Sequence, residues 1–283
     1  MTTPAGNTRF GVVFMRKIFL FLLIAALLPA PEARAEVRLP VVMYHHISQD
    51  PARACDYVVT PEQLEGDLRW LSERGCTAVS AREVIDYCAG RGELPEKPVL
   101  LTFDDGQLSV LAYALPLLEK YGMCAVAAVV GAYCDAEAGA QYRSPEYSYM
   151  TWPEVAELAS SGRFEIASHT QDMHEENSPR RGCLPRSGET PEQYAAALNA
   201  DLETVESGIE AATGARPLVF AYPFGFHCEA AAEVLRERGY ALVLTCENSV
   251  NTLSVGDGGL LELARFNRPA SADREVFFTK LGL

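Results

Sequence analysis

The sequence predicts an α/β fold in which parallel strands form a barrel. Short apolar stretches alternate with segments that carry helix-capping signals, which is typical of a parallel sheet with right-handed crossovers. Several apolar stretches run directly into Asp, His or aromatic residues, and this places the chemistry at the carboxyl ends of strands, as in a barrel. A flat doubly wound sheet is the alternative, but no glycine-rich dinucleotide loop follows the first strand.

Residues 1–35 are expected to direct export rather than to join the fold. They contain a positive segment, a short apolar core and a small-x-small cleavage signal, at residues 16–17, 18–28 and 33–35. An uncleaved membrane anchor is the alternative, and a start at Met15 would leave a more typical signal peptide. Residues 36–283 would then form a single exported domain, secreted or attached to the cell envelope, with membrane contact only through the N-terminal segment.

The charge of the expected mature chain limits its partners. Residues 36–283 carry 20 basic and 37 acidic residues, a net charge of −17. Such a surface repels nucleic acid and anionic lipid, so neither is an expected partner. A neutral or partly cationic glycan suits this charge.

All eight cysteines lie in the expected mature chain, where an even number permits disulfides. The cysteines expected in loops are the disulfide candidates, without assigned pairs: Cys55, Cys134, Cys183 and Cys246. Those within apolar helix or strand patterns are expected to be small buried hydrophobes: Cys76, Cys88 and Cys124.

Capping signals and apolar periodicity define the helices and strands. Thr60-Pro61-Glu62-Gln63 and Ser80-Ala81-Arg82-Glu83 are capping boxes, and Thr151-Trp152-Pro153-Glu154 opens a helix in the same way. The expected helices cover residues 61–75, 81–90, 111–122, 152–161, 191–212 and 230–238. Apolar stretches between them predict strands at residues 39–44, 99–103, 125–130, 164–168, 218–222 and 241–245.

The strand at residues 99–103 stops at two adjacent carboxylates, Asp104 and Asp105, followed by Gly106. Its unbroken apolar or β-branched residues indicate burial on both faces. Two carboxylates that converge at a strand end need a cation or a shared proton to offset their desolvation, so a metal ion is expected there. The alternative is a solvated Asp-Asp-Gly turn.

Two histidines follow an equivalent strand. The stretch at residues 164–168 leads directly into His169, and His174 comes five residues later. That spacing would separate the two side chains by about 140° on a regular helix, so a strand end and the loop after it explain them better. One carboxylate with two imidazoles leaves an open coordination position, which is typical of a catalytic zinc. Two hydrogen-bonded surface histidines are the alternative.

At these residues the sequence resembles the polysaccharide deacetylases with the NodB-homology domain (carbohydrate esterase family 4). The resemblance extends from residue 39 to about residue 270 and rests on four stretches: Leu39-Pro40-Val41-Val42-Met43-Tyr44-His45-His46, Thr102-Phe103-Asp104-Asp105-Gly106, Ser168-His169-Thr170 with His174, and Phe220-Ala221-Tyr222-Pro223-Phe224-Gly225. The opening stretch and the histidine spacing look most like the exported bacterial branch, which includes deacetylases of poly-N-acetylglucosamine. The family implies a distorted (β/α)7-type barrel as the single domain of residues 36–283.

The resemblance implies a metal-dependent hydrolase that removes N-acetyl groups from amino sugars of a cell-wall or extracellular polysaccharide. Asp105, His169 and His174 would hold a divalent metal, for which Zn²⁺ is the first choice. Asp104, free of the metal, would take the proton of the attacking water as general base.

The resemblance also implies residues that bind the substrate. The Tyr222-Pro223-Phe224 turn would form a wall of the site, with the Phe224 N–H facing the transition-state oxyanion and aromatic faces suited to a sugar ring. His45, directly after the first strand, is expected to line the groove rather than to bind metal, because three protein ligands already suffice.

Two positions depart from the family pattern. Many members use a histidine late in the chain as general acid, and this sequence has none after His227. Either Asp104 returns the proton that it took, or His227 or His45 supplies one from a neighbouring loop, or activity is weak. Many members also pair the catalytic aspartate with an arginine two residues before the proline of the turn, where this chain has Ala221.

Other functions could use similar residues. A non-catalytic carbohydrate-binding relative would not need all four polar residues of the site, and a metal-dependent phosphoesterase would show more basic residues around it. A sugar O-acetyl esterase stays open as an alternative, because the same oxyanion chemistry cleaves esters and amides.

Overall fold

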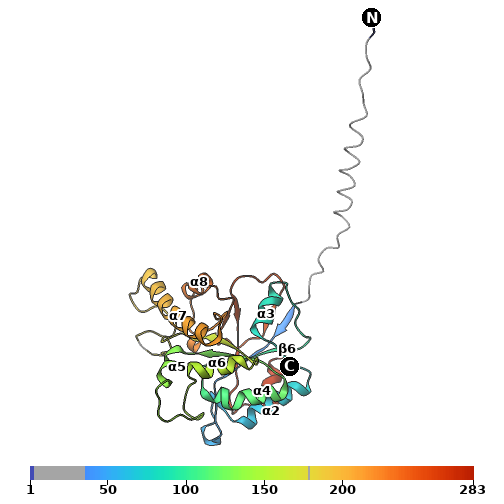
Figure 1. Ribbon diagram of the computed structural model, residues 1–283. Helices are drawn as coiled ribbons and strands as arrows, with labels where there is room; N and C mark the ends of the chain where they lie inside the picture. The colour runs from blue at the N-terminus through green and yellow to red at the C-terminus, as the bar shows by residue number, and fades with distance from the viewer. Residues whose placement is uncertain (3–35, 178) are drawn as a thin grey trace. The chain divides into compact units, whose positions relative to one another are not determined.

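The computed structural model describes residues 1–2, 36–177 and 179–283, and Glu36–Leu283 form one compact unit (Figure 1). The expected export segment, residues 1–35, lies outside the described residues except for its first two, so it stays a prediction. None of the helices in the described part is long and apolar enough to cross a membrane.

A parallel sheet forms the centre of the unit. In the order of hydrogen-bonded neighbours its strands are β12 (Leu261–Leu263), β10 (Leu242–Leu244), β9 (Val219–Ala221), β8 (Phe164–Ser168), β7 (Ala125–Val129), β6 (Pro98–Phe103), β2 (Val41–Tyr44) and β13 (Phe266–Asn267), with β5 (Thr77–Ala78) beside β6. Every residue of β6 is buried, as expected for a strand covered on both faces.

The two ends of this sheet come from one short stretch of chain. β12 pairs with β10 and β13 pairs with β2, yet only Ala264 and Arg265 separate β12 from β13. The two segments therefore share the last strand position, which links β10 to β2 and curls the sheet. If β12 and β13 are counted as one strand, the parallel strands form a ring. This ring confirms the predicted distorted (β/α)7-type barrel, and the alternative of a flat doubly wound sheet is wrong.

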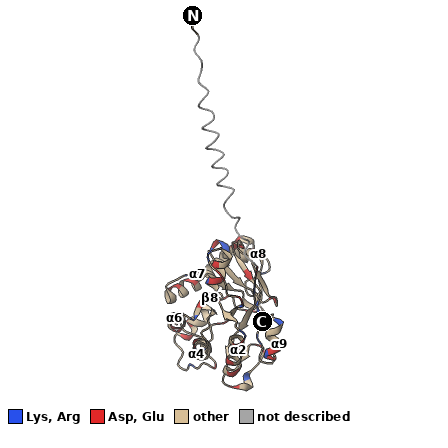
Figure 2. Cartoon of the chain, turned by 90° about the vertical axis from the view of Figure 1, so that its right-hand side faces the viewer, with Lys and Arg blue, Asp and Glu red and all other residues tan. Residues whose placement is uncertain are grey.

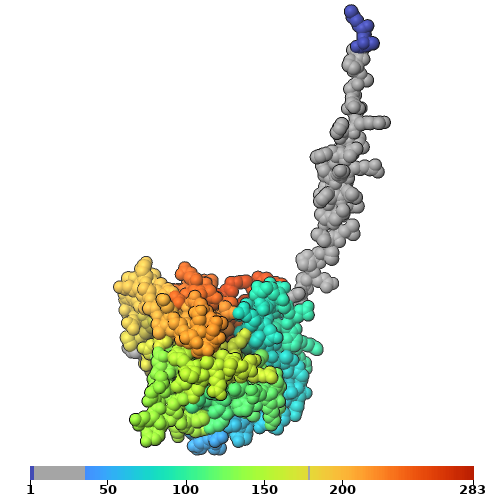
Figure 3. All heavy atoms as spheres, in the orientation of Figure 1, coloured from blue at the N-terminus to red at the C-terminus, as the bar shows by residue number. Residues whose placement is uncertain are grey.

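Helices surround the strands, and most begin where their capping signals predict. Within the described residues they are α2 (Pro61–Glu73), α3 (Ala81–Cys88), α4 (Leu115–Tyr121), α5 (Gly131–Glu137), α6 (Trp152–Ser160), α7 (Pro191–Thr213), α8 (Glu229–Glu237) and α9 (Arg274–Lys280). The capping boxes at Thr60 and Ser80 are present with both of their reciprocal hydrogen bonds, and at Thr151 the backbone N–H donates to the Glu154 carboxylate at 2.7 Å. α6 lies against α7, as the adjoining yellow-green and orange atoms show (Figure 3).

Some elements were not predicted. α5 has no side-chain cap, because Val130 stands at its N-cap position, and α9 lies beyond the last helix predicted from the sequence. The predicted strand at residues 39–44 is two strands, because Pro40 lacks an N–H and interrupts the ladder. Its first part, β1 (Val37–Leu39), pairs antiparallel with β11 (Asn251–Leu253) instead.

Three further short elements lie between β2 and α2. β3 (His46–Ile47) pairs in parallel with β4 (Val58–Val59), and the 3₁₀ turn η1 (Pro51–Arg53) lies between them. A π-helical turn, η2 (Val110–Ala114), precedes α4.

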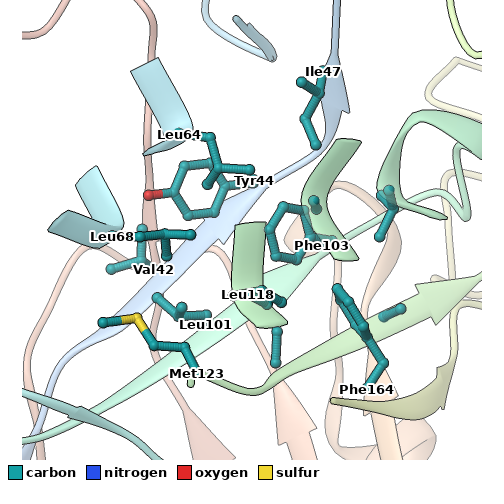
Figure 4. Packing of buried hydrophobic residues seen from close by; sticks show 14 of the residues in the cluster. Val42, Tyr44, Ile47, Leu64, Leu68, Leu101, Phe103, Leu118, Met123 and Phe164 are labelled. Atoms are coloured by element: carbon teal, nitrogen blue, oxygen red, sulfur yellow. The ribbon is translucent and has the colours of Figure 1, made fainter. Parts of the chain in front are cut away.

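Alternate residues of the strands pack on opposite faces of the sheet. On β2 and β6, Val42 and Leu101 belong to the layer between sheet and helices, where they meet Leu68 and Leu118 (Figure 4). The intervening residues belong to a second cluster that includes residues of several other strands: Val41, Leu100, Val126, Ala167, Leu242 and Leu244. This period of two is what a curled sheet with a filled interior requires. Acidic residues are spread over the surrounding helices (Figure 2).

None of the disulfide candidates is paired. All eight cysteines lie in the described part of the chain, and all are free. The loop assignment was wrong for Cys134, which is buried in α5, and Cys183 is also buried. Cys76 and Cys88 are buried as expected, whereas Cys124 is half-buried.

Candidate active site

The polar residues predicted at strand ends meet at one edge of the sheet. Asp104 and Asp105 follow β6, and His169 follows β8, which is separated from β6 only by β7. Neighbouring parallel strands end at the same edge, so these side chains converge. His174 reaches the same point from the loop after β8, and one ligand atom from each of Asp105, His169 and His174 lies within 4.8 Å of the others.

The three ligand atoms form a small triangle. Asp105 Oδ1 lies 3.6 Å from His169 Nε2 and 3.3 Å from His174 Nε2, and the two Nε2 atoms are 3.2 Å apart. Ligands that bind a tetrahedral zinc at about 2.0–2.1 Å are separated from one another by about 3.3–3.5 Å. The triangle therefore has the size that a bound divalent metal ion requires.

The second nitrogen of each imidazole has its own partner. His169 Nδ1 donates to the Ala221 carbonyl oxygen at 2.8 Å, so in the neutral ring Nε2 carries the lone pair that a metal needs. His174 Nδ1 lies 3.1 Å from the Tyr133 hydroxyl. These contacts orient both rings toward Asp105, as outer partners of metal ligands commonly do.

The turn between the two histidines is held by α7. The Asp201 carboxylate accepts the backbone N–H groups of Gln171 and Asp172, both at 2.8 Å. Burial raises the pKa of Asp201 against the opposing effect of these two N–H groups. Nothing in the sequence pattern marked Asp201, because it stands within an ordinary amphipathic helix.

Asp104 lies beside this triangle and has a different partner. Its carboxyl is 2 % exposed, and its Oδ1 accepts a hydrogen bond of 2.7 Å from Arg265 Nη1. Burial raises the pKa of Asp104, but the Arg265 guanidinium together with His169 and His45 outweighs it, so the pKa lies below its ordinary value. For Asp105, burial likewise raises the pKa, and the His169 and His174 hydrogen bonds bring it well below its usual range. Both carboxyls are thus held in the ionised form.

Arg265 was missed in the sequence. It is completely buried in the gap between β12 and β13, and it also donates to the Thr245 carbonyl oxygen at 2.8 Å and to Thr102 Oγ1 at 3.3 Å. It supplies the arginine partner that the family pattern would place at Ala221, but from the gap between β12 and β13. The available signal was a single basic residue within the apolar stretch 260–266.

Backbone strain is concentrated at this edge of the sheet. Among the described residues other than glycine, positive φ occurs at Asp105 (72°), Thr170 (75°) and Phe224 (58°). Each follows the end of a strand: β6, β8 or β9. Left-handed φ costs a β-branched or bulky residue free energy that the surrounding packing must offset, and such residues cluster at functional sites.

The residues predicted to bind substrate differ in how exposed they are. Phe224 is 40 % exposed, and its ring centroid lies 4.7 Å from that of His174, so it forms part of the rim. Tyr222 is 1 % exposed and packs on Phe220, so its side chain belongs to the core and offers no surface to a substrate. Pro223 is buried at the start of the turn η3 (Pro223–Gly225).

His45 and Asp105 line the same cavity beside the triangle. Burial lowers the pKa of His45 against the opposing effect of Asp105 and Asp104, which favours the neutral ring. His227 lies at the surface, with its ring beside Tyr222 and its Nε2 3.9 Å from Glu247 Oε1.

Comparison with known proteins agrees with this arrangement. The sequence profile of the polysaccharide deacetylases matches residues 91–243, which is more than half of the chain and includes Asp104, Asp105, His169 and His174. The chain belongs to the polysaccharide deacetylase family.

Relatives and solved structures lie in the same family. The poly-beta-1,6-N-acetyl-D-glucosamine N-deacetylase of Escherichia coli K12 is 28 % identical over 232 residues, which cover 75 % of this chain and 34 % of that protein. The chain thus spans about a third of the length of this relative. The structure of IcaB from Ammonifex degensii superimposes with a TM-score of 0.69 at 27 % identity, covering 87 % of this chain and 97 % of that one. A de-N-acetylase from Aggregatibacter actinomycetemcomitans, at 24 % identity, shares the fold with a TM-score of 0.73 over 86 % of this chain and all of that one.

Proposed function

We propose that this deacetylase family member is a metal-dependent hydrolase that removes N-acetyl groups from a polymer of N-acetylglucosamine. The observation that carries the proposal is the triangle of Asp105, His169 and His174 with an independently paired carboxylate, Asp104, beside it. A binding protein without catalysis would not need an ionised carboxylate directly beside the three candidate metal ligands.

Asp105, His169 and His174 would hold the metal ion, and Zn²⁺ is proposed because two imidazoles and one carboxylate are a frequent catalytic zinc set. When bound, such an ion supplies a Lewis acid that polarises the acetyl carbonyl and makes water acidic. The size of the triangle and the partners of both outer imidazole nitrogens support this assignment.

Asp104 is proposed to move the proton. Its carboxylate takes a proton from the attacking water as the C–O bond forms, and it returns that proton to the amine nitrogen as the C–N bond breaks. Arg265 holds the carboxylate in place during both transfers. The Phe224 backbone N–H is proposed to donate to the oxyanion that develops on the acetyl oxygen, with the left-handed backbone of Phe224 directing this group.

The proposed substrate is poly-β-1,6-N-acetylglucosamine, after the names of the relatives and in agreement with the net charge of −17 on residues 36–283. An acidic surface attracts the cationic amines that deacetylation creates along such a polymer. Export through residues 1–35 would place the enzyme where the polymer is, secreted or at the cell envelope.

The test is acetate release from β-1,6-linked N-acetylglucosamine oligomers by the purified protein, metal-free and reconstituted with zinc. Zinc-dependent release that Asp104→Ala abolishes, although this variant still binds zinc, is the expected result. Para-nitrophenyl acetate in parallel distinguishes an esterase. Tight zinc binding without release from any N-acetylated glycan would overturn the proposal.

A further inference from the structure

We propose that Asp201 of α7 is a positioning residue that sets the affinity of the candidate metal site, because it fixes the turn between His169 and His174. Asp201 is not one of the three candidate ligands, so its effect on the ion passes through the backbone of this turn. The inference rests on the proposed function, because it concerns the metal ion that the proposed deacetylation needs.

The turn that joins the two histidines depends on contacts from outside itself. Residues 170–174 lie in neither a helix nor a strand, so no regular hydrogen-bond pattern holds their backbone. Thr170 has a φ of 75°, which is an unfavourable conformation for a β-branched residue. Such a conformation persists only where the surrounding structure holds it.

On one side of the turn, a single carboxylate binds two consecutive backbone N–H groups. Asp201 Oδ1 accepts the Gln171 N–H and Asp201 Oδ2 accepts the Asp172 N–H, both at 2.8 Å. Hydrogen bonds to an ionised carboxylate are about twice as strong as neutral ones. Because both oxygens are used, the contact fixes the orientation of two successive peptide groups as well as their position.

On the other side, the first turn of α5 binds carbonyl groups of the same segment. The Gly131 and Ala132 N–H groups donate to the Thr170 and Gln171 carbonyl oxygens at 3.0 and 2.8 Å. Helix N–H groups at this end have no partner within the helix, and Val130 at the N-cap position offers them no side-chain acceptor. A Cβ atom at Gly131 would lie 1.9 Å from Gln171 Oε1, so glycine permits the close approach. The turn is thus held from two sides, and the α7 side depends on one carboxylate.

The two histidines differ in how much they need this support. The His169 N–H donates to the Val129 carbonyl oxygen of β7 at 2.9 Å, so the sheet itself fixes His169. His174 follows the turn and has the Tyr133 hydroxyl beside its ring at 3.1 Å. A ligand that is free to move must be ordered when the ion binds, and this cost lowers the affinity. Loss of the Asp201 contact should therefore weaken metal binding mainly by releasing His174.

The experiment compares Asp201→Asn and Asp201→Ala with Glu206→Gln. Glu206 is a matched control, because it lies on α7 five residues later, is 3 % exposed, and accepts hydrogen bonds from Arg238 and Arg216 outside the histidine turn. Zinc affinity is measured by competition with a chromophoric chelator, and the absorption spectrum of the cobalt-substituted proteins reports the geometry of the site. Hydrogen exchange of the Gln171 and Asp172 amides is measured in the metal-free proteins.

Asp201→Ala should weaken zinc binding by about 10- to 100-fold, which is the usual effect of losing an outer partner of a metal site, and should alter the cobalt spectrum. Asp201→Asn keeps one acceptor oxygen, so its loss should be smaller. Both amides should exchange faster in Asp201→Ala. Glu206→Gln should lower Tm but leave the zinc affinity and the cobalt spectrum unchanged.

The outcomes separate this inference from the proposed function. Unchanged zinc affinity in Asp201→Ala, unchanged amide exchange, or an equal loss of affinity in Glu206→Gln would overturn the positioning role, even if the unsubstituted protein releases acetate. If the affinities follow the expected order but no acetate is released from N-acetylglucosamine oligomers, Asp201 keeps its role and the proposed deacetylation fails. An unsubstituted protein that binds no zinc would overturn both.

Discussion

Arg265→Met should destabilise the fold by about 3–5 kcal/mol, because it leaves the Asp104 carboxylate buried without its charged partner. The two groups are 0 % and 2 % exposed, and their hydrogen bond is 2.7 Å long, so water cannot replace the guanidinium. The substitution also removes the hydrogen bonds to the Thr245 carbonyl and the Thr102 hydroxyl, each of which contributes about 1 kcal/mol.

Urea unfolding of the metal-free protein measures this loss. The double variant Asp104→Asn/Arg265→Met should be more stable than Arg265→Met alone by about 2 kcal/mol, although it carries one more change, because no charge is then left buried and unpaired. A double variant that is less stable than the single one would refute the electrostatic reasoning.

A second buried pair provides the control for function. Arg268 is 3 % exposed and donates to Asp67, which is 0 % exposed, through Nε at 2.9 Å. Arg268→Met should lose less stability, because Arg274 Nε still donates to Asp67 at 2.7 Å, and it should keep acetate release per folded molecule, because these residues lie outside the site. Arg265→Met should lower kcat at least about tenfold, since general-base catalysis contributes about 10²–10⁴. Equal activities of the two folded variants would contradict the positioning of Asp104 by Arg265.

Three further predictions concern the metal and the surrounding structure. Tyr133→Phe should weaken zinc binding by about tenfold, since it removes the outer partner of His174; competition with a chromophoric chelator measures the affinity, and an unchanged value would exclude this contribution. Zinc at a hundred times its Kd should raise the free energy of unfolding by about 2.7 kcal/mol, and His169→Ala should abolish the increase in Tm; an undiminished increase would place the ion elsewhere. Glu206→Gln should cost about 1–3 kcal/mol at pH 7, because Glu206 is 3 % exposed and accepts hydrogen bonds from Arg238 and Arg216. Burial raises the pKa of Glu206, but the two arginines lower it further, so this stabilisation is present above the unfolded pKa of about 4.3 and is lost as the pH falls through the folded pKa. Urea unfolding of both proteins from pH 7 to pH 3 should therefore show a difference that shrinks with acidity, and a constant difference would contradict it.

Local signals predicted most of the fold. The capping boxes at Thr60 and Ser80 begin helices within one residue of the predicted positions, and the strand at residues 164–168 has the predicted bounds. These elements were predictable because side chains next to one another in sequence determine a helix start or a buried strand. α5 was not predictable, since it has no capping residue. The split of the first strand at Pro40 was not predictable either, since it depends on β1 pairing with β11.

The site, like the fold, contains residues that the local sequence predicts and residues that only tertiary contacts place. Asp105, His169 and His174 could be predicted as a group because each stands at a strand end or just after it, and parallel strands bring their ends together without further information. Their partners Tyr133 and Asp201 could not, because they lie on helices α5 and α7, whose position against the strand ends is set by tertiary contacts.

Arg265 shows why a departure from a family pattern need not mean a lost function. The requirement at Asp104 is physical: a carboxylate that is 2 % exposed needs a cation within hydrogen-bond distance, whichever strand supplies it. The Ala221 side chain cannot supply this cation. Its backbone carbonyl instead accepts a hydrogen bond from His169 Nδ1. The gap between β12 and β13 points a side chain into the barrel end at the position where β10 and β2 meet, and Arg265 occupies that gap. A single sequence cannot show this exchange, because the pairing of β12 and β13 with opposite ends of the sheet is a property of the closed barrel.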